Sequence, residues 1–319
     1  MSRKVLITGG AGFIGGHVAE AYLARGDRVW IVDDLSSGRQ DNVPDGARLV
    51  RHGIGDDALA RLFEQEAGFD VVNHHAAQID VRVSVADPRR DARTNVDGFL
   101  NVVECALRHR VRRFLFVSSG GVVYGEPQQR PTPETAPKAP LSPYGVTKLS
   151  AEYYLHYYHR VHGLDYVALR YSNVYGPRQD PHGEAGVVAI FSKRLIAGEP
   201  LTVFGDGEQT RDYVYVGDVA RANMAATDAE LGQAESIDDR AFNVGTGVMT
   251  SVNDLAALLM SAAGHEVELR REAARPGELR DSSLDCARAE RLLGWRPETG
   301  VRRGLEQTYL YIAGKEAAA

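Results

Sequence analysis

Tyr144 and Lys148 have the residue types and the spacing that could make a base. They lie in the run Ser-Pro-Tyr-Gly-Val-Thr-Lys at 142–148, and a helix that begins at the proline puts positions four apart on one face. A free tyrosine titrates near ~10, but a neighbouring cation favours the phenolate and lowers its pKa. Such pairs occur by chance on many exposed helices, so this one indicates catalysis only if a nearby site needs a base.

A glycine-rich loop near the amino end of the chain supplies such a site. It follows a short apolar strand at 3–8, and the predicted cofactor residues in it are Gly9, Gly12, Phe13, Ile14 and Gly15. Glycine at every third position allows a tight turn, a close approach to a pyrophosphate and close packing of the next helix, at about 13–25. The order strand, loop, helix predicts a dinucleotide site.

Acidic residues at the end of the second strand indicate which dinucleotide is bound. The strand at 28–33 ends at Asp33 and Asp34, eighteen residues after Gly15. An acid there can bond a ribose 2′-hydroxyl and would repel a 2′-phosphate, so NAD is favoured over NADP. Ser37 and Gly38, in the following loop, complete this part of the predicted cofactor site.

Strand and helix patterns alternate through the first half of the chain. Strands are expected at 3–8, 28–33, 47–52, 70–74, 112–118 and 165–170, and helices at 13–25, 56–66, 90–109 and 143–162. This alternation predicts an α/β fold with a doubly wound, Rossmann-like parallel sheet. We expect residues 1–170 to bind NAD, with later segments such as 215–245 returning to that domain. Residues 171–319 should form mainly a substrate lobe, with loops at 176–186, 205–212 and 229–240.

The composition is that of a globular protein, with 319 residues, 44% hydrophobic and 25% charged. No apolar run approaches the ~18 residues of a membrane span, and no basic segment precedes an apolar stretch, so we expect a cytoplasmic protein without a membrane partner. A net charge of -6 and a pI near 5.9 argue against nucleic acid as a partner.

The sequence offers no pattern typical of a metal site. Cys105 and Cys286 lie far apart without ligand spacing and are expected to be buried thiols. His74 and His75 follow an apolar strand, where adjacent side chains face opposite ways, so we interpret both as structural.

Two predicted helices, 90–109 and 143–162, carry apolar or aromatic residues on more than one face. These residues are Phe99, Leu100, Val103, Tyr153, Tyr154, Tyr157 and Tyr158. The simpler explanation is deep burial in the monomer. The alternative, which we favour, is that the outer faces pair across a two-fold axis as a four-helix bundle in a homodimer.

Five motifs occur in the order found in one known family. They are Gly9 to Gly15, Val117 to Gly125, Tyr144 with Lys148, Arg170 to Gln179, and Gln209 to Val214. Together they resemble the extended short-chain dehydrogenases/reductases, and among these most closely the bacterial UDP-glucose 4-epimerases. The resemblance extends through 275–278 to Gly294 and Trp295, so it covers nearly the whole chain.

The resemblance implies a site and a reaction. NAD would be held by the glycine loop and Asp33, and also by Ile54 near the adenine, Ala76, Ala77, Asn95, and Tyr171 near the nicotinamide. Tyr144 would take the proton of the sugar 4-hydroxyl as C4 gives hydride to NAD⁺, and Lys148 would bond the nicotinamide ribose. A 4-keto sugar would then turn over and take the hydride back on its other face.

The same resemblance implies a set of substrate residues. Asn173, Arg211 and Arg275 would contact the nucleotide diphosphate, and arginine suits this because its guanidinium can hold two phosphate oxygens. Thr202 and Phe204 would border the uracil. The predicted set also contains Val187, Val188, Glu278 and Ser282, besides Ser119 and Tyr144.

The chain departs from the family pattern at three positions. Many relatives have the catalytic Ser or Thr where this chain has Gly120, so Ser119 is our candidate. The acid that often bonds adenine is Gly53 here, which leaves Asp56 or Asp57 as substitutes. A bulky tyrosine that gates the sugar pocket in some relatives corresponds to Ser282, which predicts activity on UDP-N-acetylglucosamine as well as UDP-glucose.

Other functions within and outside the family stay open to different degrees. A 4,6-dehydratase needs an Asp-Glu pair, and a UDP-glucuronate decarboxylase a glutamate, where this chain has Gly121 and Val122. A UDP-glucuronate 4-epimerase is the runner-up, although Asp180 stands where some relatives have an arginine for the carboxylate. A non-catalytic NAD-binding sensor and a simple dehydrogenase that releases NADH are the remaining alternatives.

Overall fold

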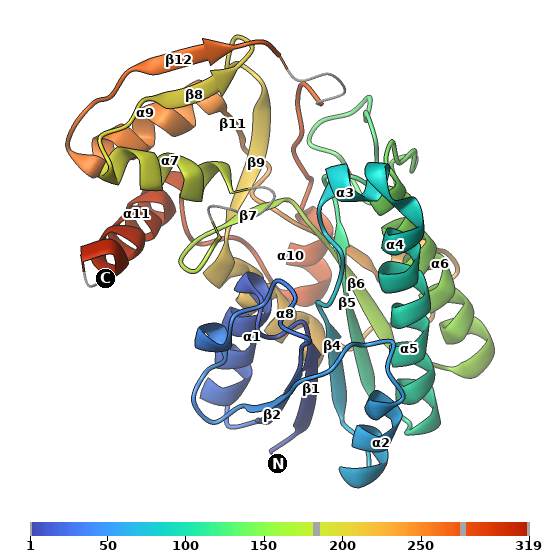
Figure 1. The fold of residues 1–319 in the computed structure, drawn as a ribbon. Coiled ribbons are helices and arrows are strands. Elements are labelled where there is room, and N and C mark those ends of the chain that lie inside the picture. Colours follow the sequence, from blue (N-terminus) through green and yellow to red (C-terminus); the bar gives the residue numbers. More distant parts are fainter. Residues whose placement is uncertain (1, 181–185, 275–278, 318–319) are drawn as a thin grey trace.

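The computed structural model describes residues 2–180, 186–274 and 279–317 and has a large and a small lobe (Figure 1). The predicted substrate residues Arg275 and Glu278 lie outside the described residues. Within these ranges every helix is too short or too polar to span a bilayer.

Seven parallel strands form the sheet of the large lobe. In spatial order they are β10 (Ala241–Val244), β6 (Tyr166–Tyr171), β5 (Arg113–Ser119), β4 (Val71–His74), β1 (Lys4–Thr8), β2 (Arg28–Val32) and β3 (Arg48–Val50). The chain leaves β1 toward one edge and later continues from β4 toward the other. Ligands of such sheets bind at this switch point, outside the carboxyl ends of the strands. The predicted doubly wound fold is confirmed.

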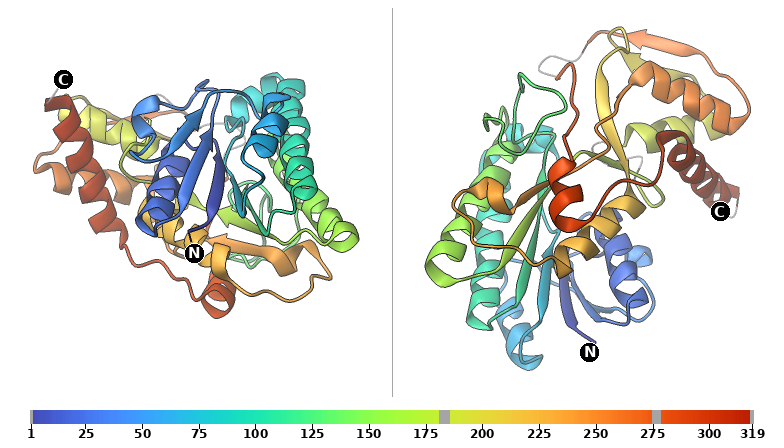
Figure 2. Two further views of the ribbon diagram at one scale, coloured as in Figure 1. Left: turned by 90° about the horizontal axis from the view of Figure 1, so that it is seen from below. Right: turned by 180° about the vertical axis from the view of Figure 1, so that it is seen from behind.

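Helices cover both faces of this sheet (Figure 2). One face carries α1 (Phe13–Ala24), α8 (Val216–Asp228) and α10 (Ala287–Leu293), and the other carries α2 (Ala58–Gln65), α5 (Phe99–Arg108) and α6 (Pro143–His162). Because both faces are covered, the central strands are continuous apolar runs. Strand β10 and helix α8 come from the second half of the chain and pack in the large lobe.

The single helix predicted at 90–109 is interrupted in the structure. It consists of α4 (Pro88–Ala92), a π-helical stretch η2 (Arg93–Gly98) and α5, and it follows the short helix α3 (Val81–Ala86). The wider π turn buries the polar side chain of Asn95, which is 4% exposed. Turns of this kind are frequent at functional sites, and hydrophobic periodicity carries no signal for them.

The small lobe has its own core and two small sheets. Its strands are β7 (Asn173–Tyr175), β8 (Leu201–Phe204), β9 (Thr210–Tyr215), β11 (Met249–Ser251) and β12 (Leu269–Glu272), and its helices are α7 (Val187–Ile196), α9 (Val252–Ala263) and α11 (Val301–Ala317). The loop predicted at 205–212 is therefore wrong from Thr210 onward. Its last residues pair with β11, a partner nearly forty residues away that a local pattern does not indicate.

Two short 3₁₀ helices complete the described elements, η1 (Gln40–Asn42) and η3 (Ile237–Arg240), so the loop predicted at 229–240 is not irregular throughout. Cys105 is buried as expected. The prediction for Cys286 is only partly met, because this residue precedes α10 at the edge of the core and is half-buried.

Candidate active site

The glycine loop lies at the carboxyl end of β1, against the loop that follows β4. Gly9 has a φ of +70°, and a Cβ there would lie 2.6 Å from the amide nitrogen of Ala76. A Cβ on Gly15 would lie 2.4 Å from the carbonyl oxygen of Gly9. Helix α1 starts after Gly12, which offers no capping side chain, so the first amides of α1 can serve an anionic group. The first two helical residues are Phe13 and Ile14.

Asp33 is folded into the same loop region. Its Oδ2 accepts a hydrogen bond from the Ala11 amide and its Oδ1 from the Leu35 amide, both at 2.9 Å. A Cβ on Gly38 would lie 2.7 Å from Asp33 Oδ1, so that loop packs directly on the carboxylate. Asp34 and Ser37 are exposed beside it. Burial raises the pKa of Asp33, and the carboxylate stands where the sequence predicts a contact with the cofactor ribose.

Asn95 holds the loop after β4 in place through both polar atoms of its side-chain amide. Its Oδ1 accepts from the Gln78 amide at 2.8 Å, and its Nδ2 donates to the Gln78 carbonyl at 2.8 Å and to Asp91 Oδ1 at 3.0 Å. This loop contains Ala76 and Ala77, two predicted cofactor residues, which are half-buried. The contacts that the structure shows for Asn95 are therefore structural ones, which hold the loop against the cofactor site.

Ile54 lies in the apolar core below the same edge of the sheet and is 8% exposed. Its carbonyl accepts a hydrogen bond from Asn101 Nδ2 at 2.7 Å. Asp56, suggested as a substitute for the missing acid at Gly53, uses Oδ2 to accept from the Gly53 amide at 2.7 Å. That carboxylate therefore stabilises the turn in which it lies.

Tyr144 and Lys148, the predicted base and its neighbouring cation, lie in the first two turns of α6. Ser142 caps the helix by accepting from the Gly145 amide at 3.1 Å, and Pro143 occupies the first turn. Lys148 is 3% exposed, its Nζ donates to the Val117 carbonyl at 2.9 Å, and it lies 5.7 Å from the centre of the Tyr144 ring. Cation and phenol are thus side by side, as the spacing predicts.

Burial lowers the pKa of Lys148 to about 8, while Asp91 and Glu152 act in the opposite direction. The Lys148 charge also acts on His74, the last residue of β4, and on the adjacent His75. Burial, and next the Lys148 charge, lower the pKa of His74 well below its usual value and that of His75 to about 3. Both histidines are therefore neutral at physiological pH, and Lys148 is the cation of this site.

Ser119 is the last residue of β5 and is half-buried. A Cβ on Gly121 would lie 3.8 Å from its Oγ, so the hydroxyl faces the start of the following turn. A side chain at Gly120 would instead meet Leu284, 2.5 Å from its Cδ1. A hydroxyl at position 120 would thus point into the apolar cluster around Leu284, which favours Ser119 as the candidate.

Tyr171 ends β6, and its side chain faces α8 rather than α6. It is 4% exposed, and its hydroxyl accepts from Asn223 Nδ2 at 2.6 Å. Its carbonyl accepts from the Gly120 amide at 2.8 Å, which ties the end of β6 to the Ser119 turn. The backbone of Tyr171 is therefore the part of this residue closest to the Ser119 turn.

The described substrate candidates lie on the strands and the first helix of the small lobe. Asn173 opens β7 and Arg211 lies in β9, where its Nη1 donates to the Thr210 carbonyl at 2.8 Å. Thr202 and Phe204 lie in β8 and are half-buried. Val187 opens α7, whereas Val188 is 1% exposed in the lobe core, so its side chain does not face an open surface.

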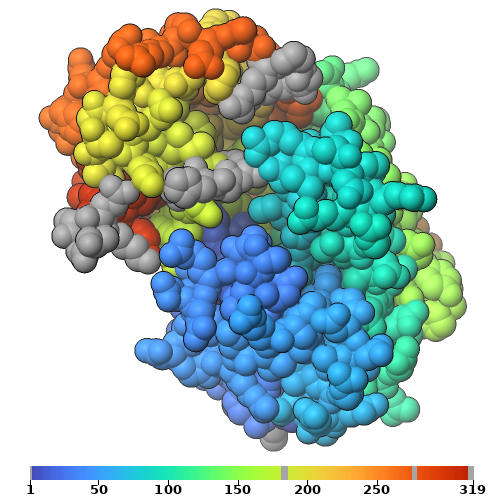
Figure 3. Space-filling model, viewed as in Figure 1, coloured from blue at the N-terminus to red at the C-terminus, as the bar shows by residue number. Residues whose placement is uncertain are grey.

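Ser282 follows β12 in the chain and is half-buried, and its amide donates to the Thr210 carbonyl at 3.2 Å. It thus lies beside β9. In the space-filling view the surface is recessed between this lobe and the large one (Figure 3).

Four buried residues near the site were missed by the sequence analysis: Asp91, Thr147, Glu152 and Arg170. Thr147 and Glu152 flank Lys148 on α6, and Arg170 lies in β6. For Asp91, Thr147 and Glu152 the sequence neighbourhood gives no hint of burial, because charged and polar residues are usually exposed. A polar residue inside the otherwise apolar strand 166–171 is the one signal that was available.

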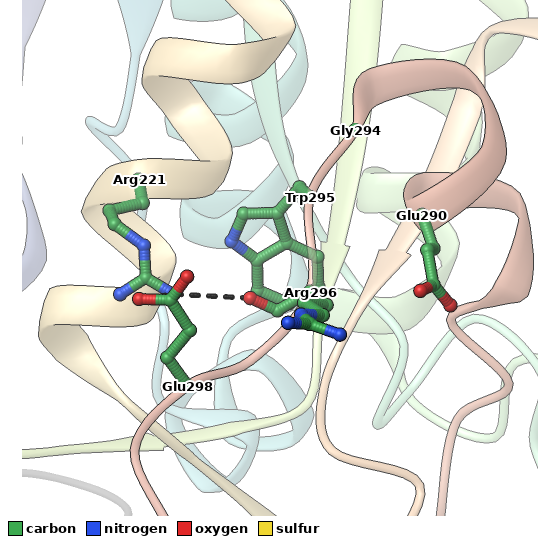
Figure 4. Close-up of a pocket in the computed structure, with 6 residues that line it drawn as sticks. All are labelled: Arg221, Glu290, Gly294, Trp295, Arg296 and Glu298. Atoms are coloured by element: carbon green, nitrogen blue, oxygen red, sulfur yellow. Dashed lines mark hydrogen bonds and ion pairs between the residues drawn. The ribbon is translucent and has the colours of Figure 1, made fainter.

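A pocket outlined on the surface lies away from this site (Figure 4). It is lined by Arg221, Glu290, Gly294, Trp295, Arg296 and Glu298, between α8 and the segment after α10. None of the predicted site residues belongs to it. Arg221 crosses it, donating to the Arg296 carbonyl at 3.1 Å and lying 3.4 Å from Glu298 Oε2.

Fold and site together define a class, the short-chain dehydrogenases/reductases, which hold a nicotinamide dinucleotide on a doubly wound sheet and use a tyrosine and lysine pair. The profile of the NAD-dependent epimerase/dehydratase family matches residues 5–245. The chain belongs to this family.

Individual relatives are similar over almost the whole chain. A UDP-glucose 4-epimerase of Mycolicibacterium smegmatis is 43% identical, covering 98% of this chain and 99% of that protein. The crystal structure of the Thermotoga maritima UDP-glucose 4-epimerase with UDP-glucose is 44% identical, with a TM-score of 0.93 and coverage of 99% and 100%. The Thermus thermophilus UDP-glucose 4-epimerase in complex with NAD is 42% identical, with a TM-score of 0.90 and coverage of 98% and 99%.

Proposed function

We propose that this protein inverts C4 of a UDP-hexose, interconverting UDP-glucose and UDP-galactose with NAD as cofactor. The observation that carries the proposal is the buried Lys148 ammonium beside Tyr144, at the same edge of the sheet as the glycine loop. The glycine loop and Asp33 fit NAD, because the uncapped first amides of α1 can bind a pyrophosphate and the Asp33 carboxylate can accept from a ribose hydroxyl. Identities of 42–44% to UDP-glucose 4-epimerases over nearly full length support the choice of reaction.

The residues have distinct tasks in this reaction. NAD, when bound, accepts a hydride and gives it back. The ionised Tyr144 takes the proton of the sugar 4-hydroxyl as hydride leaves C4, which leaves a ketone at C4. Lys148 favours the ionised phenol through its charge, and Ser119 holds the sugar oxygen. Return of the proton and the hydride, after the ketone has turned over, gives the inverted carbon.

Dehydration or decarboxylation would need further acids or bases near C5 and C6. The positions that carry them in such relatives are Gly121 and Val122, and neither side chain can move a proton. This supports epimerisation as the reaction that the same Tyr144 and Lys148 pair performs here.

For the substrate, we propose that Asn173, Arg211 and Arg275 bind the diphosphate, and that Thr202 and Phe204 border the uracil. Asn173 and Arg211 lie on the paired strands β7 and β9, and Thr202 and Phe204 lie on β8 in the second sheet of the same lobe, which supports this. Arginine can hold two phosphate oxygens at once, which suits a diphosphate.

The small side chain of Ser282 predicts a sugar pocket with room for a 2-acetamido group. We expect comparable kcat/KM for UDP-glucose and UDP-N-acetylglucosamine in the wild type. Ser282→Tyr should lower kcat/KM for the acetamido sugar by about 10-fold or more relative to glucose, since a pocket contact of this size is worth roughly 10–200-fold. Ser282→Ala is the matched control and should keep both activities. A wild type that ignores the acetamido sugar would contradict the idea.

The second candidate is a UDP-glucuronate 4-epimerase. A structure of such an enzyme from Bacillus cereus, in complex with UDP-glucuronic acid and NAD, is 31% identical with a TM-score of 0.88. Arg178 is the basic residue closest in sequence to position 180 that could bind the glucuronate carboxylate. Its Nη2, however, donates to Glu20 Oε2 at 2.6 Å and to His17 Nδ1 at 2.8 Å. This engagement, and Asp180 beside it, favour the neutral hexose.

We also propose a homodimer that pairs through α6 and the helices before it. Tyr153, Tyr154 and Tyr157 on α6 are 57%, 40% and 48% exposed, which supports an apolar outer face. Phe99, Val103 and Tyr158 are buried in the monomer and take no part. Sedimentation equilibrium should give twice the mass of the chain.

The free thiols of Cys105 and Cys286 fit a reducing compartment, which supports a cytoplasmic location.

Product analysis tests the proposed function. Purified protein without added NAD is incubated with UDP-glucose, UDP-N-acetylglucosamine and UDP-glucuronate side by side. We expect a mixture of the C4 epimers of the neutral sugars and no NADH in solution. Release of NADH would indicate a simple dehydrogenase, and absence of bound NAD and of turnover would indicate a non-catalytic binding protein.

A further inference from the structure

A buried carboxylate that the proposed reaction does not use stands next to the Tyr144 and Lys148 pair. Asp91, on α4, is 0% exposed. Its Oδ2 accepts from Thr147 Oγ1 at 2.8 Å, and its Oδ1 accepts from Gln78 Nε2 and Asn95 Nδ2, both at 3.0 Å. All three donors are uncharged. A buried charge held only by neutral donors is costly unless a cation lies near.

Lys148 is that cation. Its Nζ is buried over the Phe116 ring, 5.0 Å from the ring centre. Of the two carboxylates that raise the pKa of Lys148, Asp91 acts more strongly than Glu152. Glu152 shares its charge with Arg170, whose Nη2 donates to Glu152 Oε2 at 2.6 Å. Within the described ranges, Asp91 has no arginine or lysine at ion-pair distance, so its charge acts on Lys148 without an offsetting partner.

The other titratable groups around Lys148 do not replace this charge. His74 and His75, at the end of β4, are neutral because burial and the Lys148 charge lower the pKa of both. Tyr144 stands one turn before Lys148 on α6 and is the group that the ammonium serves. Arg170, on β6, is bound to Glu152.

Asp91 also joins the elements that form the site. The Thr147 hydroxyl is within hydrogen-bond distance of both the Asp91 carboxylate, at 2.8 Å, and the Tyr144 carbonyl, at 3.0 Å. The carboxylate is therefore bonded to the turn of α6 that carries Tyr144. Through Gln78 and Asn95 the same carboxylate reaches the loop after β4, which lies against the glycine loop. One side chain therefore contacts both halves of the predicted catalytic centre.

We propose that Asp91 is a positioning residue for the Tyr144 and Lys148 pair, whose buried carboxylate keeps the Lys148 ammonium charged and fixes the first turn of α6 against the loop after β4. The proposal rests on the proposed function, since Tyr144 is the base in that reaction. It assigns no contact between Asp91 and the sugar or NAD.

The pH dependence follows from the sign of the charges. Lys148 carries its charge below its pKa of about 8 and loses it above, so its support of the phenolate fades as the pH rises. Removing the negative charge of Asp91 makes the ammonium easier to deprotonate. The alkaline limb of the kcat profile should therefore move to lower pH in Asp91→Asn.

Lysine titration by NMR tests this without any turnover. The chain has only five lysines, so in ¹³C-lysine-labelled, NAD-saturated protein the signal of Lys148 is assigned by its loss in Lys148→Met. We expect the titration midpoint of Lys148 to fall by about 1 pH unit in Asp91→Asn, the lower end of the effect of a close opposite charge. An unchanged midpoint overturns the proposal. If Asp91→Asn does not fold, Asp91→Ser is measured with the same expectation.

Two controls separate charge from packing. Thr147→Val removes a hydrogen bond but keeps the carboxylate, so kcat should fall while the Lys148 midpoint stays; an equal shift in both variants would overturn the electrostatic role. Asp218→Asn removes a buried carboxylate on α8, on the other face of the sheet. It should change neither kcat nor the titration midpoint of Lys148. An unchanged midpoint in an enzyme that epimerises refutes this inference alone, whereas a wild type without epimerase activity refutes the proposed function and leaves the midpoint measurable.

Discussion

Tyr144→Phe should abolish C4 inversion of every UDP-sugar while the protein stays folded and keeps its NAD. The substitution removes one hydroxyl and keeps the ring, which lies 5.7 Å from Lys148 Nζ. The loss of a positioned general base costs about 10²–10⁴-fold in rate. Because Tyr144 serves both the removal and the return of the proton, we expect kcat to fall at least by the upper part of that range.

The measurement is single-sugar turnover by product analysis, with NAD content and circular dichroism recorded for the same samples. Tyr154→Phe is the matched control, since it removes a hydroxyl from a 40% exposed tyrosine of the same helix. It should leave kcat unchanged. A Tyr144→Phe protein that retains a tenth or more of the wild-type rate would show that another group is the base.

Arg170→Met should lower the free energy of unfolding by about 3–5 kcal/mol, the usual cost of removing one partner of a buried ion pair. Arg170 is 0% exposed and pairs with Glu152 on α6, with Nε 3.0 Å from Oε1 and Nη2 2.6 Å from Oε2. It also donates to Tyr124 Oη and to Asp238 Oδ1, both at 3.0 Å. Methionine fills much of the volume but leaves the Glu152 carboxylate buried without its cation.

Urea unfolding measures this loss of free energy, with the same dependence of the free energy of unfolding on urea concentration used for each protein. The matched control is Arg270→Met, whose partner Glu268 lies 3.3 Å away and whose side chains are 61% and 62% exposed. An exposed pair contributes about 0–1 kcal/mol, so this variant should unfold close to the wild type. Equal stability of both variants would mean that the buried cluster contributes no more than a surface pair.

The sequence was sufficient wherever structure follows from neighbours along the chain. Ser142 and Pro143 define the start of α6, and the spacing of four places Lys148 beside Tyr144. The glycine loop is likewise recognisable, because Gly9 and Gly15 stand where any side chain would clash with backbone. Alternating strand and helix patterns indicated a parallel, doubly wound sheet for the same reason.

Contacts between distant segments were beyond such reasoning. The strand at 210–215 was predicted as partly loop, since its partner β11 lies far along the chain. The π-helical stretch contains Asn95, whose side-chain amide bonds to both the amide and the carbonyl of Gln78, two contacts that no periodicity encodes. Val188 and Tyr171 were predicted site residues by resemblance, whereas packing directs both side chains into cores.

By itself the sequence determined the chemical groups available to this protein: a phenol, an ammonium, a glycine-rich loop and a carboxylate at the end of the second strand, all set by local spacing and backbone geometry. Only the tertiary structure decided the surroundings in which that chemistry operates. Burial lowers the pKa of Lys148 to about 8, and Asp91, 57 residues away in the chain, counters that effect from a neighbouring helix. Charge and desolvation depend on distance in space, which spacing along a chain does not report.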